Sequence, residues 1–204
     1  MSAPLSYLAL GDSYTIGESV PEAGRWPVQL AAALRAQGIA LEDPRIIATT
    51  GWTTDELSAA MDAAEPLGRH DVVSLLVGVN NQYRGWNLGE YRVEFADLLD
   101  RAIALAGDRP GRVLVLSIPD WGVTPFGQAS GRDTAEIARQ LDAFNAAAAD
   151  ECAAREVAFV DITPVSRERG AEPGMVADDG LHPSAAMYTE WTRLALPVAR
   201  VLLG

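Results

Sequence analysis

Two short stretches near opposite ends of the chain hold side chains that together could carry out nucleophilic chemistry. Ser13 stands in Gly11-Asp12-Ser13-Tyr14-Thr15, directly after an apolar run, while Asp179 and His182 share the stretch Asp179-Gly180-Leu181-His182-Pro183. A serine hydroxyl attacks an acyl carbon when a histidine accepts its proton and a carboxylate orients the imidazole. The sequence therefore predicts Ser13 as nucleophile, His182 as general base and Asp179 as the orienting acid.

Acyl transfer also needs hydrogen-bond donors for the negative oxygen of the tetrahedral intermediate. The candidate oxyanion-hole donors are the backbone N–H of Ser13, the backbone N–H of Gly51 and the side-chain amide of Asn80. Gly51 has no side chain that would obstruct the approach of a substrate oxygen. These residues come from separate parts of the chain, so the fold must bring them together.

Five apolar runs rich in β-branched residues are the elements that would position these side chains. The runs are continuous rather than alternating, which is typical of strands buried on both faces of a parallel sheet. They are Leu5–Leu10, Arg45–Thr49, Asp71–Val77, Arg112–Ile118 and Val157–Ile162. Helical patterns lie between them, and this alternation predicts right-handed βαβ units. We therefore expect a three-layer α/β/α fold with a flavodoxin-like five-stranded parallel sheet in the order 2-1-3-4-5.

The helices between these strands show apolar stripes at helical spacing. Trp26–Ala36 and Thr54–Ala64 are the first two predicted helices. Three later stripes are Tyr91, Phe95, Leu98, Leu99 and Ala102; Ile137, Leu141, Phe144, Ala148 and Cys152; and Met187, Trp191, Leu194, Val198 and Val201. Trp26, Trp191 and Cys152 are accordingly expected in the core.

The predicted strand order places the loops after strands 2, 1 and 3 side by side at the carboxyl edge of the sheet, where ligands bind in such folds. Gly51, Ser13 and Asn80 follow those three strands, and a long connection, Thr163–Pro183, could return Asp179 and His182 to the same edge. Two further long connections are Gly78–Leu88 and Pro119–Arg132. Aromatic residues in such loops either pack locally or line a substrate pocket. The candidate pocket residues are Trp52, Tyr83, Trp86, Trp121 and Phe126.

Four short blocks in this order resemble the SGNH hydrolases, also called GDSL-type esterases and lipases. The blocks are Gly11-Asp12-Ser13-Tyr14, Gly51, Gly78-Val79-Asn80-Asn81 and Asp179-Gly180-Leu181-His182. The resemblance implies one catalytic domain over residues 1–204, hydrolysis of carboxylic esters through an acyl-enzyme at Ser13, and no cofactor or metal. It also implies a small-molecule ester as substrate: members of the family act on acyl esters, lysophospholipids, thioesters and acetylated sugars. Asn81 departs from the pattern, because the third block often ends in Asp.

Each of these residues also has a purely structural interpretation. Ser13 or Asp12 could cap the helix after strand 1, and Asn80 or Gly51 could simply serve a turn. His182 could lie in a surface turn before a helix. Other residues that invite a functional interpretation are Asp178, which rivals Asp179, His70, which precedes strand 3 at the far edge, and Arg84, expected to be solvated.

Composition restricts the possible functions further. The chain has 204 residues, 1 Cys, 2 His and a formal net charge of −12. The acidic balance argues against nucleic-acid binding, and the scarcity of Cys and His argues against a zinc cluster. The apolar runs are shorter than the roughly 20 residues of a membrane span, and the N-terminus lacks the basic region of a signal peptide. We therefore expect a cytoplasmic enzyme, while the sequence leaves its oligomeric state open.

The sequence favours a small soluble acyl ester or an acetylated carbohydrate as substrate, because the chain is short, acidic and without a long apolar lid. A lysophospholipase or thioesterase is the alternative within the family. A flavin- or nucleotide-binding module on the same fold is the alternative of another class, but the phosphate-binding glycine motifs are absent from the sequence. A phospho-receiver domain would need a lysine near strand 5, and an α/β-hydrolase would need a Gly-x-Ser-x-Gly elbow; neither is present.

Overall fold

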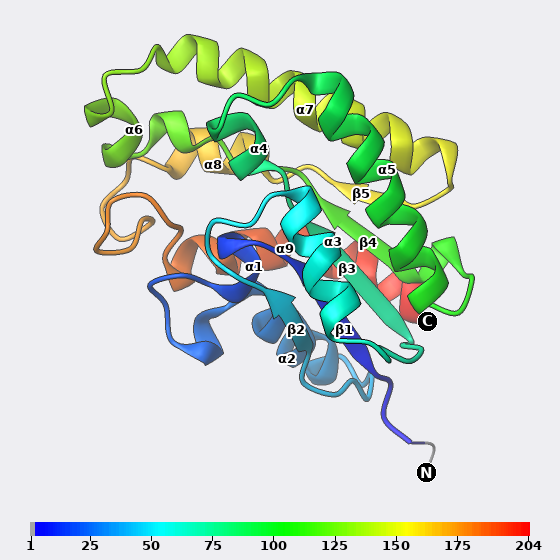
Figure 1. Cartoon of the computed structure of the whole chain (residues 1–204). Coiled ribbons are helices and arrows are strands. Elements are labelled where there is room, and N and C mark those ends of the chain that lie inside the picture. The colour runs from blue at the N-terminus through cyan, green and yellow to red at the C-terminus, as the bar shows by residue number, and fades with distance from the viewer. Residues whose placement is uncertain (1–2) are drawn as a thin grey trace.

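A five-stranded sheet in which neighbouring strands are parallel forms the centre of the molecule. The computed structural model describes residues 3–204, and Figure 1 shows their arrangement. The strand order is β2-β1-β3-β4-β5, as the sequence predicts. The strands are β1 (Tyr7–Gly11), β2 (Arg45–Ala48), β3 (Val72–Leu76), β4 (Val113–Leu116) and β5 (Ala158–Val160).

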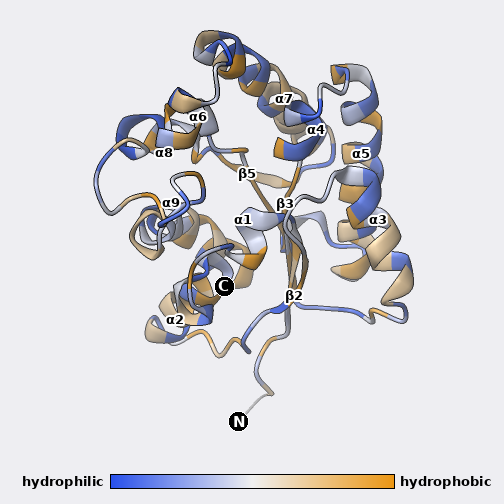
Figure 2. Ribbon diagram, turned by 60° about the vertical axis from the view of Figure 1, so that its left-hand side comes forward, coloured by the Kyte–Doolittle hydropathy of each residue, from blue (hydrophilic) through white to orange (hydrophobic). Residues whose placement is uncertain are grey.

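Helices cover both faces of this sheet, which confirms the three-layer architecture. Figure 2 shows the sheet nearly edge-on, with α2 and α9 on one side and α3 and α5 on the other; α7 packs beside α5. The helices are α1 (Ser13–Ile16), α2 (Trp26–Ala36), α3 (Thr54–Ala63), α4 (Val79–Tyr83), α5 (Leu88–Leu105), α6 (Pro125–Ala129), α7 (Thr134–Ala154), α8 (Thr163–Arg169) and α9 (Ala185–Leu203). Single turns of 3₁₀ helix are η1 (Glu22–Gly24), η2 (Pro110–Arg112) and η3 (Trp121–Val123).

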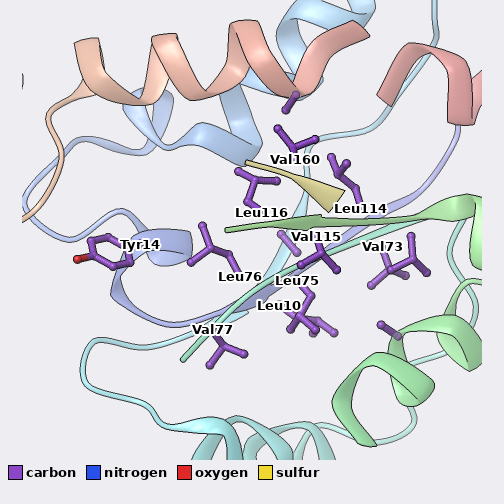
Figure 3. Close-up of a cluster of buried hydrophobic side chains, with 14 of the residues drawn as sticks. Leu10, Tyr14, Val73, Leu75, Leu76, Val77, Leu114, Val115, Leu116 and Val160 are labelled. Carbon is purple, nitrogen blue, oxygen red and sulfur yellow. The ribbon is translucent and has the colours of Figure 1, made fainter. Parts of the chain in front are cut away.

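The core lies on both faces of the three central strands. Every residue of β1, β3 and β4 is buried, and Figure 3 shows Leu10, Leu75 and Val115 packed together within this cluster. This double burial is why the strands read as continuous apolar runs. Burying one such side chain contributes roughly 1.5–3 kcal/mol, so the central strands form a rigid base for the loops that follow them.

The predicted apolar stripe of α9 is wrong in two places. Leu194 is 42% exposed and Val201 is 79% exposed. The buried face instead carries Met187, Tyr188, Trp191, Thr192, Ala195, Ala199 and Leu203. Alanines let the backbone of α9 approach α2, against which it packs. The prediction followed the large apolar side chains and overlooked the small ones.

The three long connections contain short helices rather than irregular loops. The first includes α4, the second includes η3 and α6, and the third begins with α8. Local sequence explains two of these helices, because a proline that needs no N–H partner stands in the first turn of both α6 and α8. The Thr124 hydroxyl also caps α6. Figure 1 shows α1, α4, α6 and α8 at the end of the sheet away from the N-terminus.

A membrane-spanning helix is not found: within residues 3–204, every helix is too short or too polar to cross a bilayer.

Candidate active site

The turn after β1 presents Ser13 at the first position of α1. Asp12, not Ser13, caps this helix: the Tyr14 N–H donates to Asp12 Oδ1 over 3.0 Å. Gly11 allows α1 to fold back tightly, because a Cβ at this position would lie 2.2 Å from Thr15 Oγ1 and 2.4 Å from the Leu76 carbonyl oxygen. The capping interpretation of Ser13 therefore fails, and its hydroxyl is available for another role.

Asp12 is itself unusual, because it is fully buried and its second carboxylate oxygen has no hydrogen-bond partner among the described residues. Burial raises the pKa of this carboxyl to about 7, although backbone N–H groups, including those of Tyr14 and Gly78, oppose the shift. An ionised carboxylate is costly in such surroundings, so the pKa rises.

His182 stands in a narrow loop of residues 175–184 between α8 and α9. Val176 and Pro183 pair across this loop as an antiparallel bridge, and the Ala177 N–H donates to the His182 carbonyl oxygen over 2.7 Å. Gly180, with φ of 71°, makes the turn at the tip. The local backbone thus brings the acid and the base of the predicted triad together.

Asp179, and not its neighbour Asp178, is the carboxylate that contacts His182. Asp179 Oδ2 lies 2.6 Å from His182 Nδ1, and Asp179 Oδ1 accepts the N–H groups of Leu181 and His182, each over 2.9 Å. Partial burial opposes ionisation of Asp179, but these hydrogen bonds and one from Ser19 outweigh it and lower its pKa to about 2. The carboxylate is therefore ionised at neutral pH.

Ser13 and His182 line the same cavity of about 200 Å³. Because Asp179 occupies Nδ1, the imidazole has Nε2 left for a proton from the serine. Within the described residues, no direct hydrogen bond joins the two side chains; in ligand-free sites such contacts are often long and shorten on substrate binding. The cavity is lined by Ser13, Tyr14, Val79, Asn80, Tyr83, Trp121, Phe126, Leu181 and His182.

Asn80 also reaches this cavity, from α4. One of its amide hydrogens is engaged, since Nδ2 donates to the Trp52 carbonyl oxygen over 2.9 Å. A primary amide carries two N–H donors, which leaves one for a ligand in the cavity. Gly51 is not among the residues that line the cavity. A side chain at position 51 would meet no neighbouring atom, so the glycine is needed for its backbone φ of 92° and not for space.

Two polar side chains connect α4 and its C-terminal end to the Gly51 loop and to the start of α3, which follows that loop. Arg84, expected to be solvated, donates to the Gly51 carbonyl oxygen over 2.6 Å and to Glu56 over 3.1 Å. Asn81 is fully buried and binds Thr54 twice: its Oδ1 accepts the Thr54 N–H over 3.2 Å, and its Nδ2 donates to the Thr54 hydroxyl over 2.7 Å. These contacts fix the second and third sequence blocks relative to each other.

Three of the five predicted pocket aromatics line the cavity, namely Tyr83, Trp121 and Phe126, whereas Trp52 and Trp86 do not. Tyr83 and Trp121 meet edge to face with ring centroids 5.4 Å apart. The Arg132 guanidinium stacks 4.1 Å from the Tyr83 ring centroid. These contacts hold the aromatic wall in place.

Tyr14, Val79 and Leu181 line the cavity but were not predicted. Each is the direct neighbour of a predicted catalytic or oxyanion residue, so adjacency to Ser13, Asn80 and His182 was the available signal. Side-chain direction at these positions depends on the local backbone of α1, α4 and the loop of residues 175–184, which the sequence pattern did not specify.

The remaining reactive side chains have structural surroundings. Cys152 is buried in the core, and burial raises the pKa of its thiol to about 12, which keeps it protonated. The His70 ring contacts the Leu67 carbonyl oxygen next to the start of β3. A group of three or more metal-ligating side chains is not found among residues 3–204.

Comparison with solved structures shows a shared fold. A structure of TesA matches with a TM-score of 0.76 and 20% identity, covering 97% of this chain and 99% of that one. The acetylxylan esterase Axe2 from Geobacillus stearothermophilus matches with a TM-score of 0.72 and 18% identity, over 97% and 95% of the chains. A lipase/acylhydrolase from Enterococcus faecalis gives 0.71 and 18%, over 98% and 97%. No match to a curated protein was found.

A protein-family model supplies the assignment that these distant structural likenesses cannot. The model described as the GDSL-like Lipase/Acylhydrolase family matches residues 9–189. That span contains all four sequence blocks and every residue that lines the cavity shared by Ser13 and His182. The chain therefore belongs to the GDSL-like lipase/acylhydrolase family and is a serine esterase of that family.

Proposed function

We propose that this enzyme hydrolyses carboxylic esters through an acyl-enzyme formed on Ser13. The observation that carries the proposal is the arrangement of three side chains: Ser13 and His182 line one cavity, and Asp179 lies 2.6 Å behind the imidazole. A nucleophile, a base and an orienter in this relation are what acyl transfer requires.

The reaction follows from the chemistry of these groups. Ser13 Oγ forms a bond to the ester carbonyl carbon while its proton moves to His182 Nε2, and Asp179 stabilises the imidazolium. The N–H groups of Ser13 and Gly51 and the Asn80 amide hold the oxyanion. The intermediate then expels the alcohol, which takes the proton from His182. A water molecule then gives a proton to His182 and attacks the acyl carbon of the acyl-enzyme. The bond to Ser13 Oγ breaks, Ser13 takes the proton back from His182, and the carboxylic acid is released.

The decisive experiment is Ser13→Ala, assayed with p-nitrophenyl acetate. The hydroxyl is the group that becomes acylated, so we expect turnover to disappear while the circular dichroism spectrum stays unchanged. Reaction with a fluorophosphonate should label the native enzyme at Ser13 and leave the variant unlabelled. Wild-type turnover by the variant would reject the proposal.

For the substrate we propose a small soluble acyl ester or an acetylated carbohydrate. The support is the cavity, whose volume of about 200 Å³ lies below the roughly 300–1,000 Å³ that drug-sized ligands and cofactors occupy. A panel of esters from acetate to long acyl chains, with acetylated sugars, a lysophospholipid and a thioester, tests this through kcat/KM. A preference for long chains would instead indicate a lysophospholipase, and a preference for the thioester a thioesterase.

A flavin- or nucleotide-binding role receives no support from this cavity, whose lining contains no lysine or arginine for a phosphate. A yellow colour or a retained nucleotide in the purified protein would revive it. The cytoplasmic location, the single domain over residues 1–204 and the absence of nucleic-acid binding stay predictions.

A further inference from the structure

A turn of residues 17–20, between α1 and η1, contacts three parts of the candidate site. At its base, the N–H groups of Gly17 and Glu18 both donate to the Ser13 carbonyl oxygen over 3.0 Å. The Glu18 carboxylate accepts a hydrogen bond from the hydroxyl of Thr50, the neighbour of Gly51. The 17–20 turn is therefore fixed to the nucleophile and to the second sequence block at the same time.

The third contact reaches the acid of the triad. Ser19 Oγ donates to Asp179 Oδ2 over 2.9 Å, across 160 positions of sequence. This is the oxygen that also binds His182 Nδ1. The other hydrogen bonds to Asp179 come from its own loop, through Leu181 and His182. Ser19 is thus the contact that ties Asp179 to the part of the molecule that carries Ser13.

The backbone of Ser19 is held in a conformation that serine rarely adopts. Its φ is 64°, in the left-handed region that glycine occupies without steric cost. Asp108 and Glu156 share this feature. Glu156 follows the end of α7, where a left-handed residue commonly closes a helix, and Asp108 follows Gly107, which is itself left-handed after α5. In the 17–20 turn, Gly17 already closes α1. The left-handed conformation of Ser19 therefore has another consequence, which is to aim its hydroxyl at Asp179.

We propose that Ser19 is a positioning residue of this esterase, whose hydroxyl holds the Asp179 carboxylate against His182 Nδ1. Ser19 touches neither the substrate nor the reacting atoms, and it acts through Asp179. The Asp179 side chain is 32% exposed, and the backbone N–H groups of its own loop restrain only Oδ1. Ser19 supplies a donor that restrains Oδ2, the oxygen that contacts His182. The inference rests on the proposed function, because it matters for catalysis only if Asp179 orients His182.

Asn and Asp at position 19 form a matched pair for testing this role. Both tolerate left-handed backbone and have the same shape, but only the Asn amide can donate to Asp179. We expect Ser19→Ala to lower kcat for p-nitrophenyl acetate by about three- to tenfold, the effect of one lost hydrogen bond. Ser19→Asp should lower kcat at least as much, because it also places a like charge beside Asp179. KM should stay unchanged, and Ser19→Asn should retain most of the activity.

Glycine variants separate the effect of losing the Ser19 hydroxyl from the effect of the left-handed backbone. Ser19→Gly should lose as much kcat as Ser19→Ala, although the relaxed backbone keeps its melting temperature from falling. Glu156→Gly, at an exposed left-handed position remote from the site, is the control and should keep full kcat. If Ser19 had only a structural role, kcat would instead fall in the same order as the melting temperature across these variants.

Two results would overturn the proposal: full kcat in Ser19→Ala and Ser19→Asp, or equal losses in Ser19→Asn and Ser19→Asp. Failure of the underlying function is recognised separately, because Ser13→Ala would then retain activity. If Ser13→Ala is inactive and the Ser19 variants are fully active, the esterase mechanism stands and the positioning role alone is refuted.

Discussion

His182 has one ring nitrogen committed to Asp179, and this commitment determines what the other nitrogen can do. Because the pKa of Asp179 is lowered to about 2, the carboxylate keeps its charge throughout the neutral range and favours the tautomer with the proton on Nδ1. Nε2 is then an acceptor, as a general base must be. The hydroxyl of Ser19 and the N–H groups of Leu181 and His182 donate to Asp179 and keep its carboxylate ionised.

Asn80 gives the sharpest prediction at the scale of single residues. One amide hydrogen binds the Trp52 carbonyl oxygen, and we expect the other to bind the oxyanion. Asn80→Ala should lower kcat by about 10²- to 10³-fold with little change in KM, as losing an oxyanion donor does elsewhere. Kinetics with p-nitrophenyl acetate would measure both constants.

Arg84→Met is the control for Asn80→Ala. It releases the Gly51 carbonyl oxygen and so loosens the neighbouring loop without removing a donor from the cavity. Its loss of kcat should be much smaller than that of Asn80→Ala. Equal losses in the two variants would mean that Asn80 acts by holding the loop that carries the proposed Gly51 donor and is not itself a donor to the oxyanion.

At the scale of elements, the contact between the start of α3, α4 and α5 explains the departure of Asn81 from the family pattern. The Asn81 amide donates to the Thr54 hydroxyl, which in turn donates to Glu94 on α5. An aspartate at position 81 would compete with Glu94 for the single hydroxyl proton of Thr54. The Asn81 amide and the Glu94 carboxylate are therefore complementary, because one donates to the Thr54 hydroxyl and the other accepts from it.

This pairing predicts a specific rescue. Asn81→Asp should lower the free energy of unfolding by about 1–3 kcal/mol, because the Thr54 N–H still serves one oxygen of the buried carboxylate but the other oxygen has no donor. Adding Glu94→Gln should restore most of that loss, since the Gln amide can donate to the Thr54 hydroxyl and free its proton for the new carboxylate at position 81. Urea unfolding of the four proteins gives the coupling energy; purely additive effects would contradict the pairing.

Strand order and helix periods were predictable because they depend on patterns repeated over many residues. The buried strands and the helix Trp26–Ala36 appear where the apolar periodicity places them. The misplaced stripe of α9 shows the limit, because Ala195 and Ala199 pack through close backbone approach, which apolar size does not reveal. Among the site residues, the blocks around Ser13, Asn80 and His182 predicted the cavity. The hydroxyl of Ser19 gave no signal, since its role depends on a left-handed backbone and on a partner 160 positions away.

At the scale of the whole molecule, the buried carboxyl of Asp12 links stability to pH. Its pKa rises from 3.8 to about 7 on folding, so the folded state holds a proton that the unfolded state has released. The contribution of Asp12 to stability is fully present below about pH 4 and is lost as the pH rises through about 7. Asp179 has the opposite sign, and its contribution is lost as the pH falls toward 2.

We therefore expect this contribution to make the enzyme less stable between about pH 4 and pH 7, and Asp12→Asn to flatten that decline. Asn retains the capping acceptor for the Tyr14 N–H but does not titrate. Urea unfolding across this range measures the slope for both proteins. Independently of any variant, the ¹³C resonance of the Asp12 carboxyl should titrate near pH 7; a midpoint near 4 would refute the assignment.

The distribution of the site along the chain has a consequence for biosynthesis. The proposed nucleophile belongs to the first strand–helix turn, and its base lies just before the last helix, α9. A nascent polypeptide on the ribosome therefore carries the serine long before it acquires the imidazole. Catalytic competence should arise only after His182 and α9 have been synthesised and α9 docks beside α2, so that chains that stop before His182 cannot cleave esters.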